Sequence, residues 1–129
     1  VDVIVADVAG KGFAASLIMA SVKATLPFVT AESSVAESMS KLNERLAPEL
    51  GRGEFVALTL ARYSPADQTV ELANAGAPDP YRVHPTLPPA PLSVPGPRLP
   101  LGNGFPRSLE IVTRDQPHRC FPGYPATRG

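Results

Sequence analysis

The sequence predicts a mixed α/β (α+β) fold in which antiparallel strands are covered by two helices, and three observations support this. An aliphatic run at residues 1–8 is typical of a buried strand. Two stretches with apolar residues at helical spacing follow it, and two strand-like segments then come in direct succession. Strands that follow one another without a helix between them favour antiparallel pairing over an alternating parallel sheet.

The 129 residues suffice for one domain of modest size, and their composition argues against several classes of partner. Twelve basic and twelve acidic residues give a formal charge of zero, so no long-range field favours nucleic acid or an anionic membrane surface. The apolar runs fall short of the roughly 20 residues that span a bilayer. The single cysteine, Cys120, cannot form an internal disulfide, which favours a reducing, cytoplasmic location. We therefore expect no nucleic acid and no membrane among the partners.

Two helices are predicted in the first half of the chain. Residues 13–26 are rich in Ala, Leu and Met at helical spacing, and Pro27 is expected to end or kink this helix. The second helix, at residues 34–47, starts with Ser34 three residues before Glu37, which is the spacing of a capping box. Its apolar residues then follow one face.

A strand hairpin is predicted next. The segments 54–63 and 68–75 are strand-like and are separated by Ser-Pro-Ala-Asp, a proline-initiated turn. Both faces of the first segment are largely apolar, as expected of a strand that is covered by helices on one side and by a second sheet on the other.

Proline divides the chain at residue 77, because thirteen of the sixteen prolines follow it. This part should be mostly loop and extended connection. We expect a short strand within 79–83 and a last strand at 107–113, whereas the tail at 114–129 resembles neither helix nor strand.

The glycine turn between the first strand and the first helix is the main candidate for a functional site. Gly10 and Gly12 fit the permissive dinucleotide-binding pattern G-x-G-x-x-A, and Glu32 lies about 20 residues further on. The consecutive strands at 54–75 argue against that fold, and Asp7 would place a negative charge beside a pyrophosphate. The pattern of a P-loop fails at both ends.

Asp7 gives the turn a second interpretation. A carboxylate at the end of a strand, next to the carbonyl groups of a turn, offers hard oxygens of the kind that Mg²⁺ or Mn²⁺ prefers. From spacing alone, Asp7 can equally hold the turn by a hydrogen bond and take no part in chemistry. One carboxylate does not make a metal site, so the residues alone leave both alternatives open.

Four blocks of the sequence, in order between residues 3 and 102, resemble one family. "VADVAGKGFAASLIMASVKATL" is similar to the GDVSGKG-x-AA-LMA segment of the sporulation stage II protein E-type phosphatases, bacterial members of the metal-dependent PPM (protein phosphatase 2C-like) superfamily. "SKLNERL" matches their Leu-Asn-x-x-Leu helix, and "EFVALTLARYSPADQTVELANAG" their Phe-Val-Thr hairpin and Asn-Ala-Gly turn. "PGPRLPLG" matches their Pro-Leu-Gly segment.

The resemblance implies a PPM-type α-β-β-α sandwich of antiparallel sheets flanked by helices, of which this chain holds the central part. It implies hydrolysis of phosphoserine or phosphothreonine on a protein such as an anti-anti-sigma factor, in a partner-switching pathway with a fused or separate sensor domain. Asp7 then corresponds to the aspartate that bridges two Mn²⁺ or Mg²⁺ ions, and the Val8 backbone carbonyl to a further ligand. Gly10 and Gly12 would allow the tight turn beneath the metals.

The sequence also departs from the family pattern. The upstream Gly-Gly-Asp block and the downstream Thr-Asp-Gly block, each with a metal-binding acid, have no match, and Asp115 is a poor substitute. Ala77 replaces the usual histidine after Asn-Ala-Gly. We therefore expect residues 1–113 to form a partial phosphatase domain that is inactive by itself, with 114–129 outside the family. A catalytically dead binding or regulatory module of the same fold is the alternative, ahead of a dinucleotide-binding domain.

Overall fold

The computed structural model describes residues 1–31, 33–94 and 99–102, together with the backbone of 113–115. Glu32, the candidate ribose-binding acid, and Cys120 lie outside this part of the chain. The described elements are β1 (Asp2–Val8), α1 (Phe13–Thr30), α2 (Val35–Leu46), β2 (Val56–Ser64), β3 (Thr69–Ala75), β4 (Tyr81–Arg82), β5 (Ala90–Pro91) and β6 (Thr113–Asp115).

The main sheet has four strands in the order β1-β2-β3-β6, and each neighbouring pair is antiparallel. The predicted hairpin of β2 and β3 is therefore confirmed. β1 also runs antiparallel to β2, with Asp2 opposite Arg62 and Val8 opposite Val56. A dinucleotide-binding fold needs parallel strands joined by a crossover helix, so this pairing excludes it.

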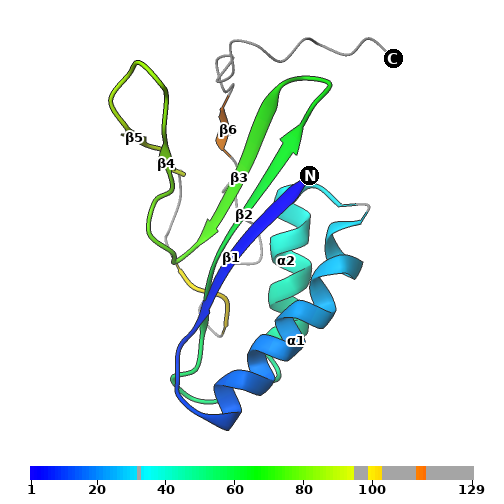
Figure 1. Ribbon diagram of the computed structural model, residues 1–129. Helices are drawn as coiled ribbons and strands as arrows, with labels where there is room; N and C mark the ends of the chain where they lie inside the picture. The colour runs from blue at the N-terminus through cyan, green and yellow to red at the C-terminus, as the bar shows by residue number, and fades with distance from the viewer. Residues whose placement is uncertain (32, 95–98, 103–112, 116–129) are drawn as a thin grey trace.

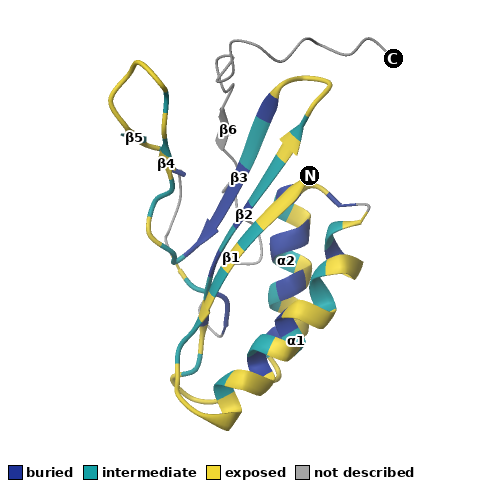
Figure 2. Ribbon diagram, in the orientation of Figure 1, coloured by how far each residue is buried: buried dark blue, intermediate teal, exposed yellow. Residues whose placement is uncertain are grey.

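Both helices cover the same face of the sheet (Figure 1), as the sequence predicts. Alternate residues of β1 point to that face, so that Ile4, Ala6 and Val8 pack against the buried core. The inward sides of α1 and α2 are buried and their outer sides are exposed (Figure 2). The largest fully buried hydrophobic side chains are Val22, Val35, Met39, Leu42, Leu46, Val56, Leu58, Leu60 and Leu101.

α1 is longer than predicted, because it continues through Pro27 to Thr30. Proline removes one helical hydrogen bond, but Val29 beyond it is buried in the core and the Thr30 hydroxyl donates to the Leu26 carbonyl (2.9 Å). By length and composition, α1 is the one helix among the described residues that could cross a membrane, with a mean hydropathy of 1.5. The expectation that every apolar run is too short is therefore wrong for α1, although core helices of folded domains meet the same criterion.

The start of α2 confirms the predicted capping box. The Ser34 hydroxyl accepts a hydrogen bond from the Glu37 backbone N–H (3.2 Å), and the Glu37 carboxylate accepts one from the Ser34 backbone N–H (2.9 Å). Two N–H groups that an open helix end would leave unpaired are satisfied in this way. The helix therefore begins within one residue of the predicted position.

The proline-rich part differs from prediction in two places. β5 pairs with β4 where only loop was expected, and both strands stand on the side of the sheet away from the helices (Figure 1). The last strand is described at 113–115, paired with β3, whereas the rest of the predicted strand at 107–113 lies outside the described residues. The last two residues of β6 fall in the segment 114–129, for which the sequence predicts neither helix nor strand. The β3–β6 pairing joins segments far apart in sequence, and β5 lies in a proline-rich segment without periodicity, so the local pattern predicts neither.

Candidate functional site

Asp7 lies near the end of β1, on the face of the sheet away from the helices. Its neighbours Ala6 and Val8 pack toward the core, so the alternation of the strand turns Asp7 outward, and its side chain is exposed. It forms no hydrogen bond or ion pair with the described residues, and α1 has no side-chain cap. The structure therefore gives no support to the alternative in which Asp7 holds the turn.

The hydrogen-bond pattern of β1 shows where the backbone carbonyl of Val8 points. Val1 and Tyr63 exchange two hydrogen bonds (3.0 and 2.8 Å), and the Ala9 N–H donates to the Phe55 carbonyl (2.9 Å). Hydrogen-bonded and non-hydrogen-bonded pairs alternate along an antiparallel ladder, so the odd-numbered residues of β1 face β2 with their polar groups. The carbonyl of Val8 consequently points away from β2.

The partner of Val8 supports this assignment. Val56, opposite Val8, uses its own N–H and carbonyl to bond Leu101 on its other side (3.1 and 2.8 Å). β1 has β2 as its one neighbour among the described strands, so Val8 faces a free edge there. The Asp7 carboxylate and the Val8 carbonyl are thus two open oxygen donors on consecutive residues, which we call the Asp7 corner.

The turn after the Asp7 corner has the conformation that its glycines permit. Gly10 and Gly12 have φ values of 131° and 77°, a region that residues with a side chain rarely adopt. Gly12 precedes α1, and its carbonyl accepts hydrogen bonds from the Ser16 backbone N–H and hydroxyl (3.3 and 3.1 Å). Lys11 between them is exposed. The two glycines therefore allow the tight turn from β1 into α1.

The Asp7 corner offers fewer oxygen donors than a complete Mg²⁺ or Mn²⁺ site uses. Hard oxygen donors without a competing partner suit Mg²⁺ or Mn²⁺, so the two groups fit such an ion. No group of three His, Cys, Asp or Glu side chains comes together within the described residues. The backbone of Asp115 pairs with Val70, at the end of the sheet where β1 begins, about 20 Å along the strands from Asp7.

Several other polar side chains among the described residues have local structural partners. His84 lies near the tip of the β4–β5 hairpin, where its Nδ1 accepts a hydrogen bond from the Thr86 N–H (3.2 Å). Glu49 accepts a hydrogen bond from the Ser21 hydroxyl (2.6 Å), and Glu54 accepts one from the Gly51 N–H (2.7 Å).

Three of the four sequence blocks meet at one place, which we call the motif junction. The Asn43 side-chain oxygen accepts a hydrogen bond from the Gly102 N–H (2.8 Å) and so joins α2 to the Pro-Leu-Gly segment. Gly76 has a φ of 74°, and a Cβ atom there would lie 2.8 Å from the backbone nitrogen of Pro100. Only glycine allows this approach, so the motif junction depends on Gly76.

Asn74 completes the motif junction. It is 2% exposed, and its side-chain amide donates to the Ala77 carbonyl (2.9 Å) while its oxygen accepts from the Ala77 N–H (2.8 Å). Neither Asn43 nor Asn74 was predicted from the sequence to have a role. Their position within motifs was the available signal, but their partners lie across a turn or 59 residues away.

An ion pair fixes the opposite end of β1. Arg62 donates from Nε and Nη2 to the two carboxylate oxygens of Asp2 (2.7 Å each), and from Nη2 to the Thr30 carbonyl (2.9 Å). It also donates to the Ser33 carbonyl. The hydrogen bonds from Arg62 lower the pKa of Asp2, and the same pair raises the pKa of Arg62. The start of β1 is therefore tied to β2 and to the loop between the helices.

Comparison with known families gives the decisive observation. A family model described as stage II sporulation protein E (SpoIIE) matches residues 1–113. The chain belongs to the SpoIIE family. The resemblance drawn from the four sequence blocks is therefore confirmed, and the Asp7 corner and the motif junction are both parts of a SpoIIE domain. A comparison with the sequences of characterised proteins gives no match.

The fold of the chain is also found among solved structures. The crystal structure of the RsbU and RsbW domains of Rv1364c from Mycobacterium tuberculosis matches with a TM-score of 0.71 at 18% sequence identity. The match covers 88% of this chain and 32% of that one. At this identity the similarity concerns the fold, and it confirms the predicted PPM-type arrangement of antiparallel strands and helices.

Proposed function

We propose that this SpoIIE-family chain supplies part of the centre of a metal-dependent protein serine/threonine phosphatase. The Asp7 corner is the observation that supports this proposal: an exposed carboxylate, which has no partner among the described residues, and an outward carbonyl lie side by side where the edge strand ends. In this proposal Asp7 is a bridging metal ligand and the Val8 carbonyl is a second donor. Gly10 and Gly12 allow the turn that keeps both groups open.

The chemistry follows from the donor set. Bound Mn²⁺ or Mg²⁺ would neutralise a phosphomonoester and supply an activated water near neutral pH. The residues of this chain would hold the ion and orient its oxygen ligands. The β1–β2 ladder sets the direction of the Val8 carbonyl, and the Ala9 hydrogen bond to Phe55 fixes the start of the turn.

The proposed substrate is a phosphoserine or phosphothreonine on a protein, such as an anti-anti-sigma factor in a partner-switching pathway. Family membership supports this proposal, and so does the matched structure, which contains an RsbU and an RsbW domain. A sensor domain, fused or separate, would belong to the same pathway. We also propose a cytoplasmic location, since such regulators act there.

We expect no turnover by the 129-residue chain itself. Two-metal hydrolysis needs ions about 3.5–4 Å apart, so that one water is activated while the phosphoryl group is clamped. The described residues bring one carboxylate to the Asp7 corner, and a single carboxylate can bridge two ions but cannot hold both.

The test compares the chain with a chimera that adds the flanking blocks of an intact family member. Both are assayed with p-nitrophenyl phosphate and a phosphoserine peptide in excess Mn²⁺. We expect hydrolysis by the chimera alone, its loss in Asp7→Asn, and its retention in Asp67→Asn, a matched exposed acid in the β2–β3 turn. A chimera equally active with Asp7→Asn would contradict the proposal, and a folded chimera without activity would favour the catalytically dead module.

A further inference from the structure

The outer side of α1 carries an unusual exposed surface. Phe13, Leu17 and Phe28 are 79%, 54% and 85% exposed, and Ala20 and Ala24 between them are exposed as well. We call these five residues the outer stripe. Their spacing of four and three residues is that of a helix–helix seam, and the stripe lies opposite the side of α1 that enters the core. Apolar side chains gathered in this way mark interaction surfaces.

The near absence of charge on α1 fits an uncharged, apolar partner surface. All residues of α1 are described, and Lys23 is its one charged residue. Lys23 lies beside the outer stripe and not within it, by helical spacing. No like charges would therefore meet if two such stripes faced each other.

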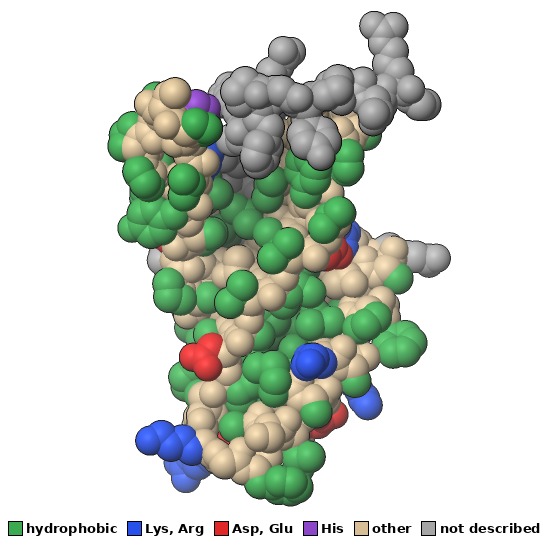
Figure 3. Space-filling view, viewed as in Figure 1, with side chains coloured by type: hydrophobic (Ala, Val, Ile, Leu, Met, Phe, Trp, Pro, Cys, Tyr) green, Lys and Arg blue, Asp and Glu red, His purple; other side chains and the backbone are tan. Residues whose placement is uncertain are grey.

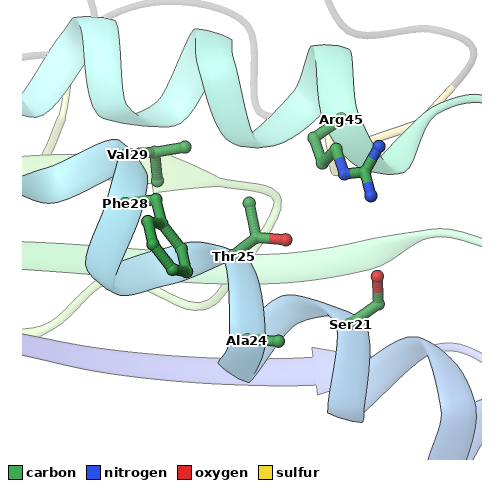
Figure 4. A pocket seen from close by; sticks show the side chains of 6 residues that line it. All are labelled: Ser21, Ala24, Thr25, Phe28, Val29 and Arg45. Atoms are coloured by element: carbon green, nitrogen blue, oxygen red, sulfur yellow. The ribbon is translucent and has the colours of Figure 1, made fainter.

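A groove beside the outer stripe adds a receiving surface. It has a volume of about 450 Å³ and is lined by Ser21, Ala24, Thr25, Phe28, Val29 and Arg45. Figure 4 shows the Arg45 side chain extending from α2 toward α1, with Phe28 at the other end of the groove. An aromatic ring placed there would meet Phe28 and lie near a guanidinium group, both favourable contacts.

We propose that the outer stripe binds the same stripe of a second copy of this chain, with the two α1 helices antiparallel. A twofold axis between Ala20 and Ser21 places Leu17 opposite Ala24 of the second copy. It also places Phe13 of the second copy opposite Phe28, at the groove. Large residues thus meet small ones near the axis and aromatic rings meet at both ends, which is the self-complementarity that a twofold contact requires.

The size of the contact indicates a weak dimer. Each Phe, exposed as it is, would bury on the order of 150 Å². With Leu17 and the alanines included, two copies would bury about 1,000 Å² in total, which is the lower limit for a specific interface. The dimer should therefore depend on concentration. Its formation is independent of the phosphatase activity proposed above.

The first test is sedimentation equilibrium of the chain from low micromolar to millimolar concentration. We expect reversible dimer formation. Ala20→Glu places like charges at the axis and should weaken the dimer at least about ten-fold. Lys23→Glu introduces the same residue on the same helix beside the stripe, and should change the dissociation constant less than about three-fold. Circular dichroism identifies any variant that fails to fold.

The second test distinguishes the antiparallel arrangement by crosslinking in a Cys120→Ser background. Ala20→Cys places the two thiols near the axis, so a short bismaleimide should join the copies. Ala14→Cys places them about 20 Å apart along the helices, so it should not. Crosslinking of both variants would overturn the antiparallel pairing. A chain that stays monomeric at all concentrations would overturn the dimer, whether or not it binds neutral lipid vesicles or an added apolar helix.

Discussion

The motif junction and the Asp7 corner come from different blocks of the same family pattern, and the hydrogen bonding of their polar groups differs. At the motif junction, Asn43 and Asn74 have partners for their side-chain oxygens, and Gly76 is in contact with Pro100. At the Asp7 corner, the carboxylate is exposed and the adjacent carbonyl points to an edge of the sheet that has no neighbour among the described strands. The two regions lie at the same end of the sheet, because the end of β1 pairs with the start of β2.

The difference separates residues that stabilise the domain from the two oxygen donors that we propose to be functional. An amide whose oxygen is hydrogen-bonded inside the domain contributes to stability and has less acceptor capacity left for a ligand. An open carboxylate contributes little to stability and keeps all of its acceptor capacity. Substitutions at the motif junction should therefore lower the free energy of unfolding, whereas substitutions at the Asp7 corner should leave it nearly unchanged. Figure 3 shows one face of the molecule, on which hydrophobic side chains are widely spread and charged side chains are few.

Gly76→Ala should have the largest effect on stability. The new Cβ would lie 2.8 Å from the Pro100 nitrogen, and the residue would keep a φ of 74°. Overlap with backbone atoms and a strained backbone together should lower the free energy of unfolding by about 3 kcal/mol. Urea denaturation measures it. Gly53→Ala is the control, because its φ is 83° but no atom lies within 4 Å of the added Cβ, so about 1 kcal/mol is expected. Equal losses would show that the contact with Pro100 is unimportant.

Asn43→Ala should come next. It leaves the Gly102 N–H without its partner, and the loss of such a hydrogen bond costs about 1–2 kcal/mol. Glu44→Ala, its exposed neighbour in α2, should change the free energy of unfolding by less than about 0.5 kcal/mol. If the two variants were equally stable, the link between α2 and the Pro-Leu-Gly segment would not contribute.

Asp2→Asn should have a smaller effect that depends on pH. Arg62 lowers the pKa of Asp2 from its ordinary value of 3.8, so the folded state favours the charged form. The stabilisation is present above the unfolded pKa and is lost as the pH falls through the folded one. Because both side chains are 24% exposed, we expect less than about 1 kcal/mol at pH 7. Urea denaturation at neutral pH and near pH 2 compares the variants. A difference that persists in acid would contradict the ion-pair explanation.

Asp7→Asn should have the smallest effect on stability, within about 0.5 kcal/mol of the parent chain. Its carboxylate has no hydrogen-bond or ion-pair partner among the described residues, so no contact is lost. Thermal unfolding of the two proteins in a chelating buffer measures the difference. Clear destabilisation would assign Asp7 to the scaffold and remove the contrast between the two regions.

The sequence predicted those parts of the fold that depend on local pattern. The capping box of Ser34 and Glu37 and the hairpin of β2 and β3 are encoded by spacing and turn residues, and the structure confirms them. The contact of Gly76 with Pro100 is not local, and β5 lies in a proline-rich segment without periodicity, so the sequence pattern predicted neither. α1 continues beyond Pro27 because packing against the core stabilises its last turn, and such packing cannot be predicted from local helix propensity. Asp7 could be selected from the sequence because it lies at the end of a predicted strand. That the neighbouring Val8 carbonyl points away from β2 follows only from the register of β1 on β2.

The most direct test of the central claim is Mn²⁺ titration of the isotope-labelled chain, followed by paramagnetic broadening of its backbone amide signals. A weak ion site is still detected in this way, and two donors should give affinity in about the millimolar range. We expect broadening to begin at residues 7–12 and at the facing start of β2, to vanish in Asp7→Asn, and to persist in Asp67→Asn. Broadening centred on Glu49 and Glu54, or unchanged in Asp7→Asn, would contradict the assignment of the Asp7 corner as the metal-binding part of this SpoIIE domain.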